Sequence, residues 1–436
     1  MKRYQALAFM SLASLWIVCF GATELLAQRS LTDNQIAYYQ QLIKRNPRNA
    51  KVYFGLGDAL IRKARETGDP DYYNRAEEAL KKSLEIAPKN AGAMRHLAYV
   101  FYSRHEFEPA ATHARKALTL DPIDGDTYGV LGDALLEIGE YDKAAQAYRK
   151  MMELEESLYS YSRLAGLKSM RGDSAGAIDD LKLAIAAGKA ARQPAESIAW
   201  AEWQLGSDYF ALGNLQEAES YFSRSLNTYP SYYRALAGLA QLRAAQRHYD
   251  EAIELYQKAL AVLPMPEYAA ALGDIYAKTG RRELAKQQYD LVEYIGRLSK
   301  LNQVLYNREL AYFYVDHDIN LIESLELAKR ELDYRKDIYA YDLLAWSLYK
   351  NGKAEGARLA IKEALKLGTR DAKLFFHAGM IYHSLGDTEK AKEYLTRAIG
   401  TNPHFHPTFA ETAAQTLKQL ERGAERADGE GQSRGG

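Results

Sequence analysis

Residues 272–289, LGDIYAKTGRRELAKQQY, and residues 205–222, LGSDYFALGNLQEAESYF, decide the fold of this 436-residue chain. In both stretches a Leu is followed by a Gly, and an Ala stands twelve positions after that Gly. Short turn sequences such as Gly213-Asn214 divide the stretches into two halves. The pattern predicts two antiparallel helices that approach closely where the Gly and the Ala lie, with aromatic side chains filling the gap to the next such unit.

The same pattern recurs along the chain at a nearly fixed spacing. Ten pairs of a Leu or Ala with a small residue occur from Leu56-Gly57 to Ala378-Gly379, and six of the nine steps between them are 33 or 34 residues. Prolines such as Pro88, Pro122 and Pro230 follow several units, because Pro cannot continue a helix. A single hairpin cannot bury its apolar face, so we predict that neighbouring hairpins stack and share one core.

This pattern resembles the tetratricopeptide repeat, which reads W-x2-L-G-x2-Y, then A-x3-F, then P over 34 residues. The resemblance is carried by Leu272-Gly273 with Tyr276, and by Leu205-Gly206 followed by Ala218 and Phe222. It implies an all-α fold, a right-handed superhelical α-solenoid of about ten helix-turn-helix units over residues 28–407. Residues 341–407 are also similar to exported bacterial repeat proteins of unassigned role, and that resemblance adds no activity.

Both ends of the chain differ in composition from the repeats. Residues 1–27 start with Met1-Lys2-Arg3, continue with an uncharged apolar run and give way to polar sequence, as a secretory signal peptide does. The apolar run is short for a membrane span. We expect a mature chain that is periplasmic or secreted and does not span a membrane; an uncleaved anchor is the alternative. At the other end we predict a capping helix over 408–420 and a disordered, Gly-rich and charged tail over 421–436.

Composition and motifs exclude several classes of function. Lys+Arg and Asp+Glu are 57 each, and this balance argues against a nucleic-acid partner, which usually requires a basic patch. The only cysteine, Cys19, lies in the predicted signal peptide, so the mature chain would have no disulfide. The chain has no Gly-rich nucleotide-binding loop, no H-E-x-x-H and no G-x-S-x-G. We therefore predict that it is not an enzyme and that it uses no cofactor and no metal.

Three polar clusters could nevertheless suggest a metal ion. Asp121, Asp124 and Asp126 resemble part of a calcium loop, but the later Gly and the final Glu of such a loop are missing. We interpret this cluster as a turn and a helix cap. The acidic turn at Asp316 and the pair His404 and His406 also lack a complete ligand pattern, so metal binding is the less favoured alternative at both.

The resemblance also implies that the first helix of each unit lines a concave groove. Fourteen residues beside the Leu–small pairs form the predicted partner-binding set: Phe54, Arg95, Tyr99, Tyr102, Tyr159, Trp200, Trp203, Phe210, Arg308, Tyr312, Tyr339, Trp346, Tyr349 and Phe376. Aromatic residues and Arg are enriched at interface hot spots. Packing of these aromatics in the core is the alternative. Asp58, Asp133 and Asp274 stand where the family's peptide-carboxylate clamp needs Lys and Asn, so we do not transfer that activity.

These observations together predict a non-catalytic scaffold. It would bind a partner protein or an extended peptide in the groove, within an exported, periplasmic assembly. The alternative is a carbohydrate-binding solenoid that supports polysaccharide or cell-wall assembly, because aromatic faces also stack on sugar rings. An enzyme with an unrecognised site near Asp316 is the third hypothesis.

Overall fold

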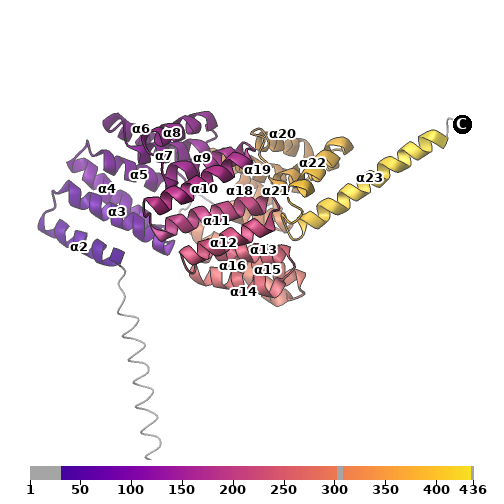
Figure 1. The fold of residues 1–436 in the computed structure, drawn as a ribbon, viewed down its shortest axis with the longest axis horizontal. Coiled ribbons are helices and arrows are strands. Elements are labelled where there is room, and N and C mark those ends of the chain that lie inside the picture. The colour runs from indigo at the N-terminus through magenta and orange to yellow at the C-terminus, as the bar shows by residue number, and fades with distance from the viewer. Residues whose placement is uncertain (1–30, 302–307, 434–436) are drawn as a thin grey trace, which may run out of the picture. The chain divides into compact units, whose positions relative to one another are not determined.

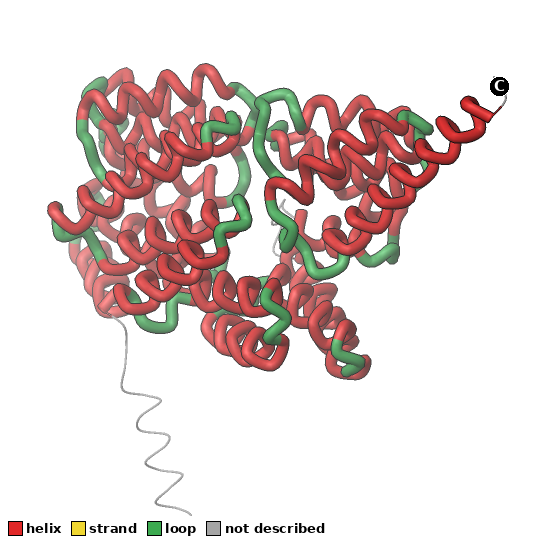
Figure 2. Tube along the Cα trace, turned by 45° about the vertical axis from the view of Figure 1, so that its right-hand side comes forward, coloured by secondary structure: helices red, strands yellow, loops and turns green. Residues whose placement is uncertain are grey.

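A computed structural model describes residues 31–301 and 308–433. Within these residues the chain forms 22 helices joined by short loops and no strand (Figure 2). The predicted signal peptide, residues 1–27, lies outside the described residues. The chain divides into two compact units, Met1–Val100 and Phe101–Gly436, and the division falls inside one helix. The all-helical, paired architecture predicted from the repeat is confirmed.

The first compact unit holds one helix that the repeat pattern does not contain. Helix α2 (Leu31–Arg45) precedes the first helix pair and packs against α3 (Ala50–Thr67). Helix α3 pairs with α4 (Asp71–Ile86), and Gly68, with φ of 69°, ends α3 in the left-handed conformation that favours glycine. Most of α5 (Ala91–Ser103) also belongs to this unit.

The second compact unit contains the remaining helix pairs and a final helix (Figure 1). Its helices after α5 are α6 (Phe107–Leu120), α7 (Gly125–Glu137), α8 (Tyr141–Leu154), α9 (Leu158–Met170), α10 (Ser174–Ala190), α11 (Ala195–Ala211), α12 (Leu215–Thr228), α13 (Tyr233–Ala245), α14 (Tyr249–Val262), α15 (Pro266–Lys278), α16 (Arg282–Leu301), α17 (Arg308–Asp316), α18 (Leu321–Tyr334), α19 (Ile338–Lys350), α20 (Ala354–Ala364), α21 (Ala372–Ser384), α22 (Thr388–Thr401) and α23 (Phe409–Ser433). We number the helix pairs 1 to 10, from α3–α4 to α21–α22, and call the two helices of each pair A and B.

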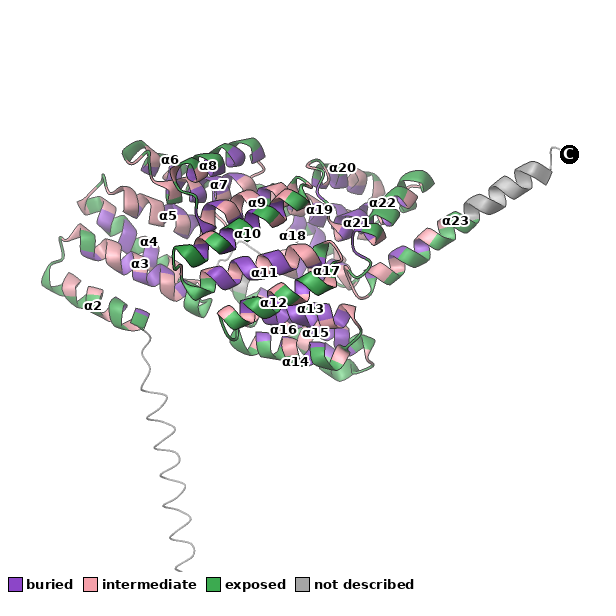
Figure 3. Cartoon of the chain, in the orientation of Figure 1, coloured by how far each residue is buried: buried purple, intermediate pink, exposed green. Residues whose placement is uncertain are grey.

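Small residues hold the two helices of a pair together, as the sequence predicts. A Cβ added at Gly206 of α11 would lie only 2.7 Å from the ring of Phe222 on α12, so only glycine allows this ring to approach. Ala218, twelve residues after Gly206, is completely buried. Most helices alternate between buried and exposed residues, which are purple and green in Figure 3. This alternation is the pattern of amphipathic helices that share a core.

Within the second compact unit, several pairs also stack on the next through their A helices. Helix α11 contacts α9 on one side and α13 on the other, and α19 likewise contacts α17 and α21. Polar N-caps fix where several A helices begin. Asp124 accepts a hydrogen bond from the backbone N–H of Thr127, which confirms that the cluster around Asp121 and Asp126 includes a helix cap.

Within the second compact unit, the turns of early pairs touch the linkers of late pairs. The backbone N–H of Lys336 donates to the carbonyl of Glu137 at 2.8 Å. Thr369 donates through its hydroxyl to the carbonyl of Met170, and the Asn402 amide donates to the carbonyl of Phe210 at 2.8 Å. In each contact, the turn between the A and B helices of one pair meets a linker between two later pairs. That linker follows the pair that stands five places further along the chain. We call this line of contacts the seam.

The C-terminal helix extends past the range expected for it. Helix α23 runs from Phe409 to Ser433, whereas a capping helix over 408–420 was predicted. Glu, Arg and Ala, which are frequent between residues 421 and 428, are strong helix formers. A disordered tail over 421–436 stays a prediction.

Candidate functional site

One repeat position forms a row of side chains along the A helices. The residue five places before the repeat's Leu is Tyr159 in pair 4, Trp200 in pair 5, Arg234 in pair 6 and Glu267 in pair 7. All four are half-buried, so each keeps part of its side chain in contact with solvent. Because stacked repeats place equivalent positions on the same face, we expect these four side chains to lie along one face of the A helices.

Aromatic rings dominate the middle of this row. The Trp200 and Trp203 rings lie 6.4 Å apart on α11, and both tryptophans pack against buried Tyr232 and Ala235 of the next pair. The Arg234 guanidinium lies over the rings of Trp203 and Tyr233, 5.1 Å and 5.2 Å from their centres. Such cation–π contacts hold the guanidinium in place. We call Trp200, Trp203, Tyr233 and Arg234 the aromatic surface.

Two acidic groups on the A helices of pairs 5 and 7 have unusual environments. Burial raises the pKa of the Asp208 carboxyl to about 6, although Gln204 donates a hydrogen bond to it at 3.0 Å. Burial also raises the pKa of the Glu267 carboxyl. Its Oε2 atom is buried without a hydrogen-bond partner among the described residues. These environments favour the neutral carboxyl, because charge is poorly solvated there.

A different arrangement occupies the A helices of pair 3 and pair 4. Arg163 forms a two-pronged ion pair with Asp133, with its Nε and Nη2 each 2.8 Å from a carboxylate oxygen. The hydroxyl of Tyr148 donates to the same carboxylate at 2.9 Å. The strong donors and acceptors of this group are therefore used within the protein.

Pairs 8 to 10 carry the largest set of such contacts. Arg308 bonds to Glu331 at 2.9 Å and to Asp337 at 2.8 Å. Arg335 bonds to the same Glu331 at 3.3 Å and reaches across the seam to Glu137 at 2.8 Å. Because Glu331, Arg335 and Asp337 are all buried, each charge depends on its partners for stabilisation.

The same network continues to the end of the array. Tyr312 donates to Asp342 at 2.8 Å, and buried His377 lies 2.8 Å from the other oxygen of that carboxylate. The His377 ring stacks on Trp346 at 4.2 Å, and Trp346 donates its indole N–H to Asp316. We call the linked groups of pairs 8 to 10, together with His105 and Glu137, the polar network.

His105 joins the network from the turn after α5. The Arg335 guanidinium donates to Nδ1 of His105 at 2.8 Å, so Nδ1 must be the unprotonated ring nitrogen. Burial, with the nearby charges of Arg335 and Arg308, lowers the pKa of His105 to about 3. His105 is therefore neutral at pH 7 and serves as an acceptor.

The structure separates the fourteen predicted partner-binding residues into groups. Phe210, Trp346 and Phe376 are buried in the core, with Trp346 only 2% exposed, so these three have no exposed face for a partner. The other eleven are half-buried. Among them Arg308, Tyr312 and the Tyr339 carbonyl belong to hydrogen bonds of the polar network. For the half-buried residues, partner binding stays a prediction.

Within the first compact unit, Phe54 lies edge-on to His96 at 4.9 Å, while Arg95 and Tyr99 lie half-buried on α5. In the second unit, Tyr102 packs edge-on to Phe107. Tyr159 bonds to Ser197 at 3.1 Å, and Tyr349 stacks on Trp346 at 4.9 Å.

Sequence reasoning missed Arg234, although a signal for it was present. Arg234 stands at the same repeat position as the predicted residues Tyr159, Trp200 and Tyr339. Aligning the ten repeats on this position, instead of selecting aromatics beside each Leu, would have added Arg234 and Glu267 to the set.

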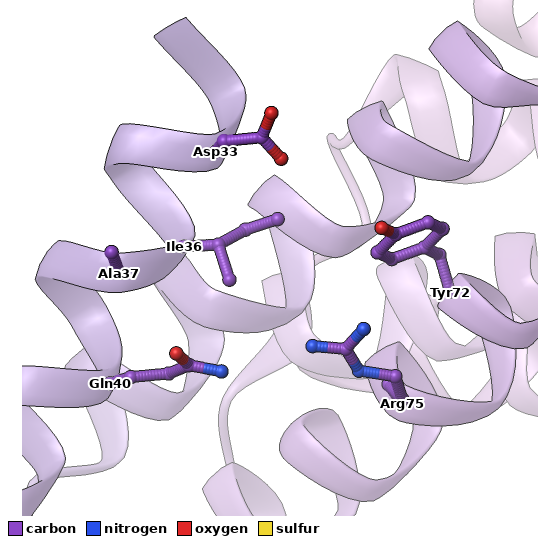
Figure 4. A pocket seen from close by; sticks show the side chains of 6 residues that line it. All are labelled: Asp33, Ile36, Ala37, Gln40, Tyr72 and Arg75. Carbon is purple, nitrogen blue, oxygen red and sulfur yellow. The ribbon is translucent and has the colours of Figure 1, made fainter. Parts of the chain in front are cut away.

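The first compact unit contains a small pocket of its own (Figure 4). Asp33, Ile36, Ala37 and Gln40 of α2 face Tyr72 and Arg75 of α4 across a space of ≈ 350 Å³. Asp33 is ion-paired with Lys63 at 2.9 Å, and the Arg75 guanidinium lies over the Tyr72 ring. The pocket exists because α2 adds a helix outside the repeat pattern.

The clusters considered for metal binding have other roles in the structure. Asp316 is bonded to Lys373 at 2.9 Å, and His406 accepts hydrogen bonds from the backbone N–H groups of Thr408 and Phe409. Among the described residues, no group of three or more His, Cys, Asp or Glu side chains is arranged to hold a metal ion. No helix within 31–301 or 308–433 is long and apolar enough to cross a membrane.

Models of known protein families identify the family of the chain. Three models described as tetratricopeptide repeat match it: one over residues 36–91, 95–154 and 239–294, one over 197–265 and one over 372–405. Together these segments cover more than half of the sequence. The chain belongs to the tetratricopeptide repeat proteins. Proteins of this family are generally non-catalytic scaffolds that bind protein or peptide partners, and the predicted repeat family is thus confirmed.

Individual relatives of this tetratricopeptide repeat protein are distant. It is 21% identical to the TPR repeat-containing protein MJ1428 of Methanocaldococcus jannaschii over 85% of its own length and 53% of the relative's. It is 24% identical to the TPR repeat-containing protein YpiA of Bacillus subtilis, over 74% of this chain and 75% of YpiA. Among solved structures, the human IFIT1 dimer with PPP-AAAA aligns over 73% of each chain, with 18% identity and a TM-score of 0.49. The chain thus spans about half the length of MJ1428.

Proposed function

We propose that this chain is a non-catalytic scaffold that binds a segment of a partner protein on the aromatic surface of pairs 5 and 6. The observation that carries the proposal is the contrast along the A helices. In pairs 8 to 10 the polar groups are bonded to each other. Trp200, Trp203 and Arg234 are instead half-buried and held in place by contacts with rings. Trp, Tyr and Arg are the residues that most often dominate binding energy at protein interfaces.

The rigidity of this surface supports the same proposal. Trp200 and Trp203 are anchored by packing against the next pair, so binding would immobilise few additional rotamers. A preorganised surface loses less entropy on association than a flexible one. The sugar-binding alternative uses the same rings, and the experiment below separates the two.

We also propose that the scaffold works outside the cytoplasm. Residues 1–27 have the charge and hydropathy layout of a secretory signal peptide, and this is the feature that supports export. N-terminal sequencing of the protein from cell fractions tests the idea. A new N-terminus near residue 28 in the exported fraction is expected, and an intact Met1 in the cytoplasmic fraction would contradict it.

Crosslinked pull-down tests the binding proposal. Wild type is compared with Trp200→Ala/Trp203→Ala, with Trp200→Phe/Trp203→Phe, and with the control Tyr38→Ala/Tyr294→Ala. The control removes two exposed rings from outside the A helices, Tyr38 being 57% exposed on α2 and Tyr294 53% exposed on α16. Captured proteins are then purified, and their Kd values for the four chains are measured. We expect binding to fall at least about tenfold only in the Ala pair and to recover partly in the Phe pair.

Equal Kd values for all four chains would contradict the proposal. Retention of glycans on wild type, with no protein bound directly, would favour the carbohydrate-binding alternative. Circular dichroism of each variant confirms that the helices are retained.

A further inference from the structure

The charge of Arg234 has no partner of its own among the described residues. Its guanidinium makes no hydrogen bond and no ion pair with any of them; the contacts the structure gives it are the rings of Trp203 and Tyr233. By contrast, Arg163, Arg308 and Arg335 each bond directly to a carboxylate. Arginine is costly to bury partly without acceptors, because its N–H donors lose water.

The nearby carboxyl of Glu267 does not fill this role. Glu267 and Arg234 interact electrostatically, yet their charged groups do not come close enough to form an ion pair. The Oε2 atom of Glu267 is buried and has no hydrogen-bond partner among the described residues, so it does not accept from Arg234. Its neutral form is also favoured by burial. The donors of Arg234 are therefore left for a group that comes from outside.

The geometry points to a carboxylate as that group. We propose that Arg234 binds an acidic side chain, Asp or Glu, within the partner segment, while an apolar neighbour of that acid packs on Trp200 and Trp203. This rests on the proposed function and names the chemistry of its partner. A guanidinium presents its N–H donors in a planar fork that matches the two oxygens of a carboxylate. The contacts with the Trp203 and Tyr233 rings hold the guanidinium in place before binding.

A random peptide library tests the inference on the full chain. Twelve-residue peptides, displayed with their C-termini joined to the phage coat protein, are selected on wild type and on Arg234→Gln. We expect Asp or Glu next to an apolar residue to be enriched on wild type and not on the variant. Because these peptides have no free C-terminus, enrichment reports on acidic side chains.

A synthetic peptide pair then measures the contact itself. The enriched peptide, with an amidated C-terminus, and its counterpart with Glu→Gln or Asp→Asn are titrated by fluorescence anisotropy. The proteins are wild type, Arg234→Lys, Arg234→Gln and the control Arg330→Gln, which changes an exposed arginine on α18. In wild type and the control, the acid-to-amide change is expected to weaken binding about tenfold. On Arg234→Gln the two peptides should bind equally, and on Arg234→Lys the difference should be smaller than in wild type.

The outcomes separate this inference from the proposed function. Peptides that need Trp200 and Trp203 but bind Arg234→Gln as well as wild type would overturn the role of Arg234 and leave the binding surface intact. Failure of wild type to enrich any peptide would count against the proposed function itself. If Arg234→Gln unfolds, as circular dichroism would show, the comparison of Arg234→Lys with the control decides, and an unchanged acid-to-amide difference in Arg234→Lys would overturn the inference.

Discussion

The A helices of pairs 8 to 10 and those of pairs 5 and 6 present the same repeat positions but use them differently. In pairs 8 to 10 the polar network joins Arg308, Arg335, Glu331 and Asp337, whose charges satisfy one another. In pairs 5 and 6 the corresponding face carries aromatic rings and an arginine without an acceptor. The repeat therefore fixes where a side chain lies, and its neighbours decide whether it is available to a partner.

The polar network includes contacts across the seam, so it depends on the overall stacking of the pairs. Arg335 contacts His105, which lies 230 residues earlier in the sequence, and also Glu137. The stacking of the intervening helix pairs brings these residues together. The aromatic surface is fixed by adjacent pairs alone. Changes in the network should therefore affect stability strongly, and changes in the aromatic surface should affect mainly binding.

Arg335→Ala should have the largest effect on stability. The change leaves the buried carboxylate of Glu331 and the half-buried carboxylate of Glu137 without one of their cations. Loss of one partner of a buried ion pair destabilises by about 3–5 kcal/mol. Urea denaturation followed by circular dichroism measures the loss. Lys329→Ala, which removes an exposed ion pair from the preceding helix α18, should leave the urea midpoint unchanged. A similar midpoint for both variants would show that the network is not structural.

Gly139→Ala should have the next largest effect, because it obstructs the seam. Gly139 has a φ of 80°, and an added Cβ would lie 2.7 Å from the carbonyl oxygen of Lys336. Gly280→Ala is the matched control, with a φ of 77° and nothing within 4 Å of the added Cβ. Backbone strain of about 1–2 kcal/mol is common to both. Gly139→Ala should lose about 1–3 kcal/mol more, and equal urea midpoints would contradict the seam contact.

Asp208→Asn should stabilise the protein. The folded-state pKa of Asp208 is raised to about 6, so the group favours folding below its unfolded pKa, and this contribution disappears as the pH rises through 6. At pH 7 the carboxylate is charged in a poorly solvated place. Its neutral substitute should raise the free energy of unfolding on the order of 1–3 kcal/mol at pH 7 and not at pH 4. Exposed Asp179→Asn should show no such pH-dependent gain.

His105→Gln should have the smallest effect, visible only in acid. The folded pKa of His105 is lowered to about 3, so the histidine stays neutral in the folded state while the unfolded chain takes up a proton below about pH 6.5. The contribution of His105 to the free energy of unfolding is therefore complete above pH 6.5 and decreases as the pH drops towards 3. In His105→Gln the free energy of unfolding should decrease less steeply with falling pH, by about 1 kcal/mol per pH unit between pH 6 and pH 4. Exposed His248→Gln should leave the slope unchanged.

Much of the fold could be predicted from local pattern. The recurring small residues at Gly206 and Ala218 encode close helix packing, and that information lies within one repeat. The seam could not be predicted in this way. Its contacts, such as that of Asn402 with the Phe210 carbonyl, depend on small angles between pairs that accumulate over five repeats. The accumulated angle cannot be predicted from any short segment of the sequence.

The candidate site was predictable in part for the same reason. Trp200 and Trp203 were found because aromatics beside the repeat Leu are visible in the sequence. The burial of Trp346 and Phe376 was not visible, because it depends on α23 and Phe409 packing over the last pair.

The central claim is that a partner contacts pairs 5 and 6 while the network of pairs 8 to 10 keeps its own contacts. Fluorine NMR of the full chain labelled with 5-fluorotryptophan tests it in one sample, with resonances assigned by single Trp→Phe changes. On addition of the peptide selected above, the signals of Trp200 and Trp203 should shift, and that of Trp346, buried against His377, should not. A shift of Trp346 with Trp200 and Trp203 unmoved would contradict the account.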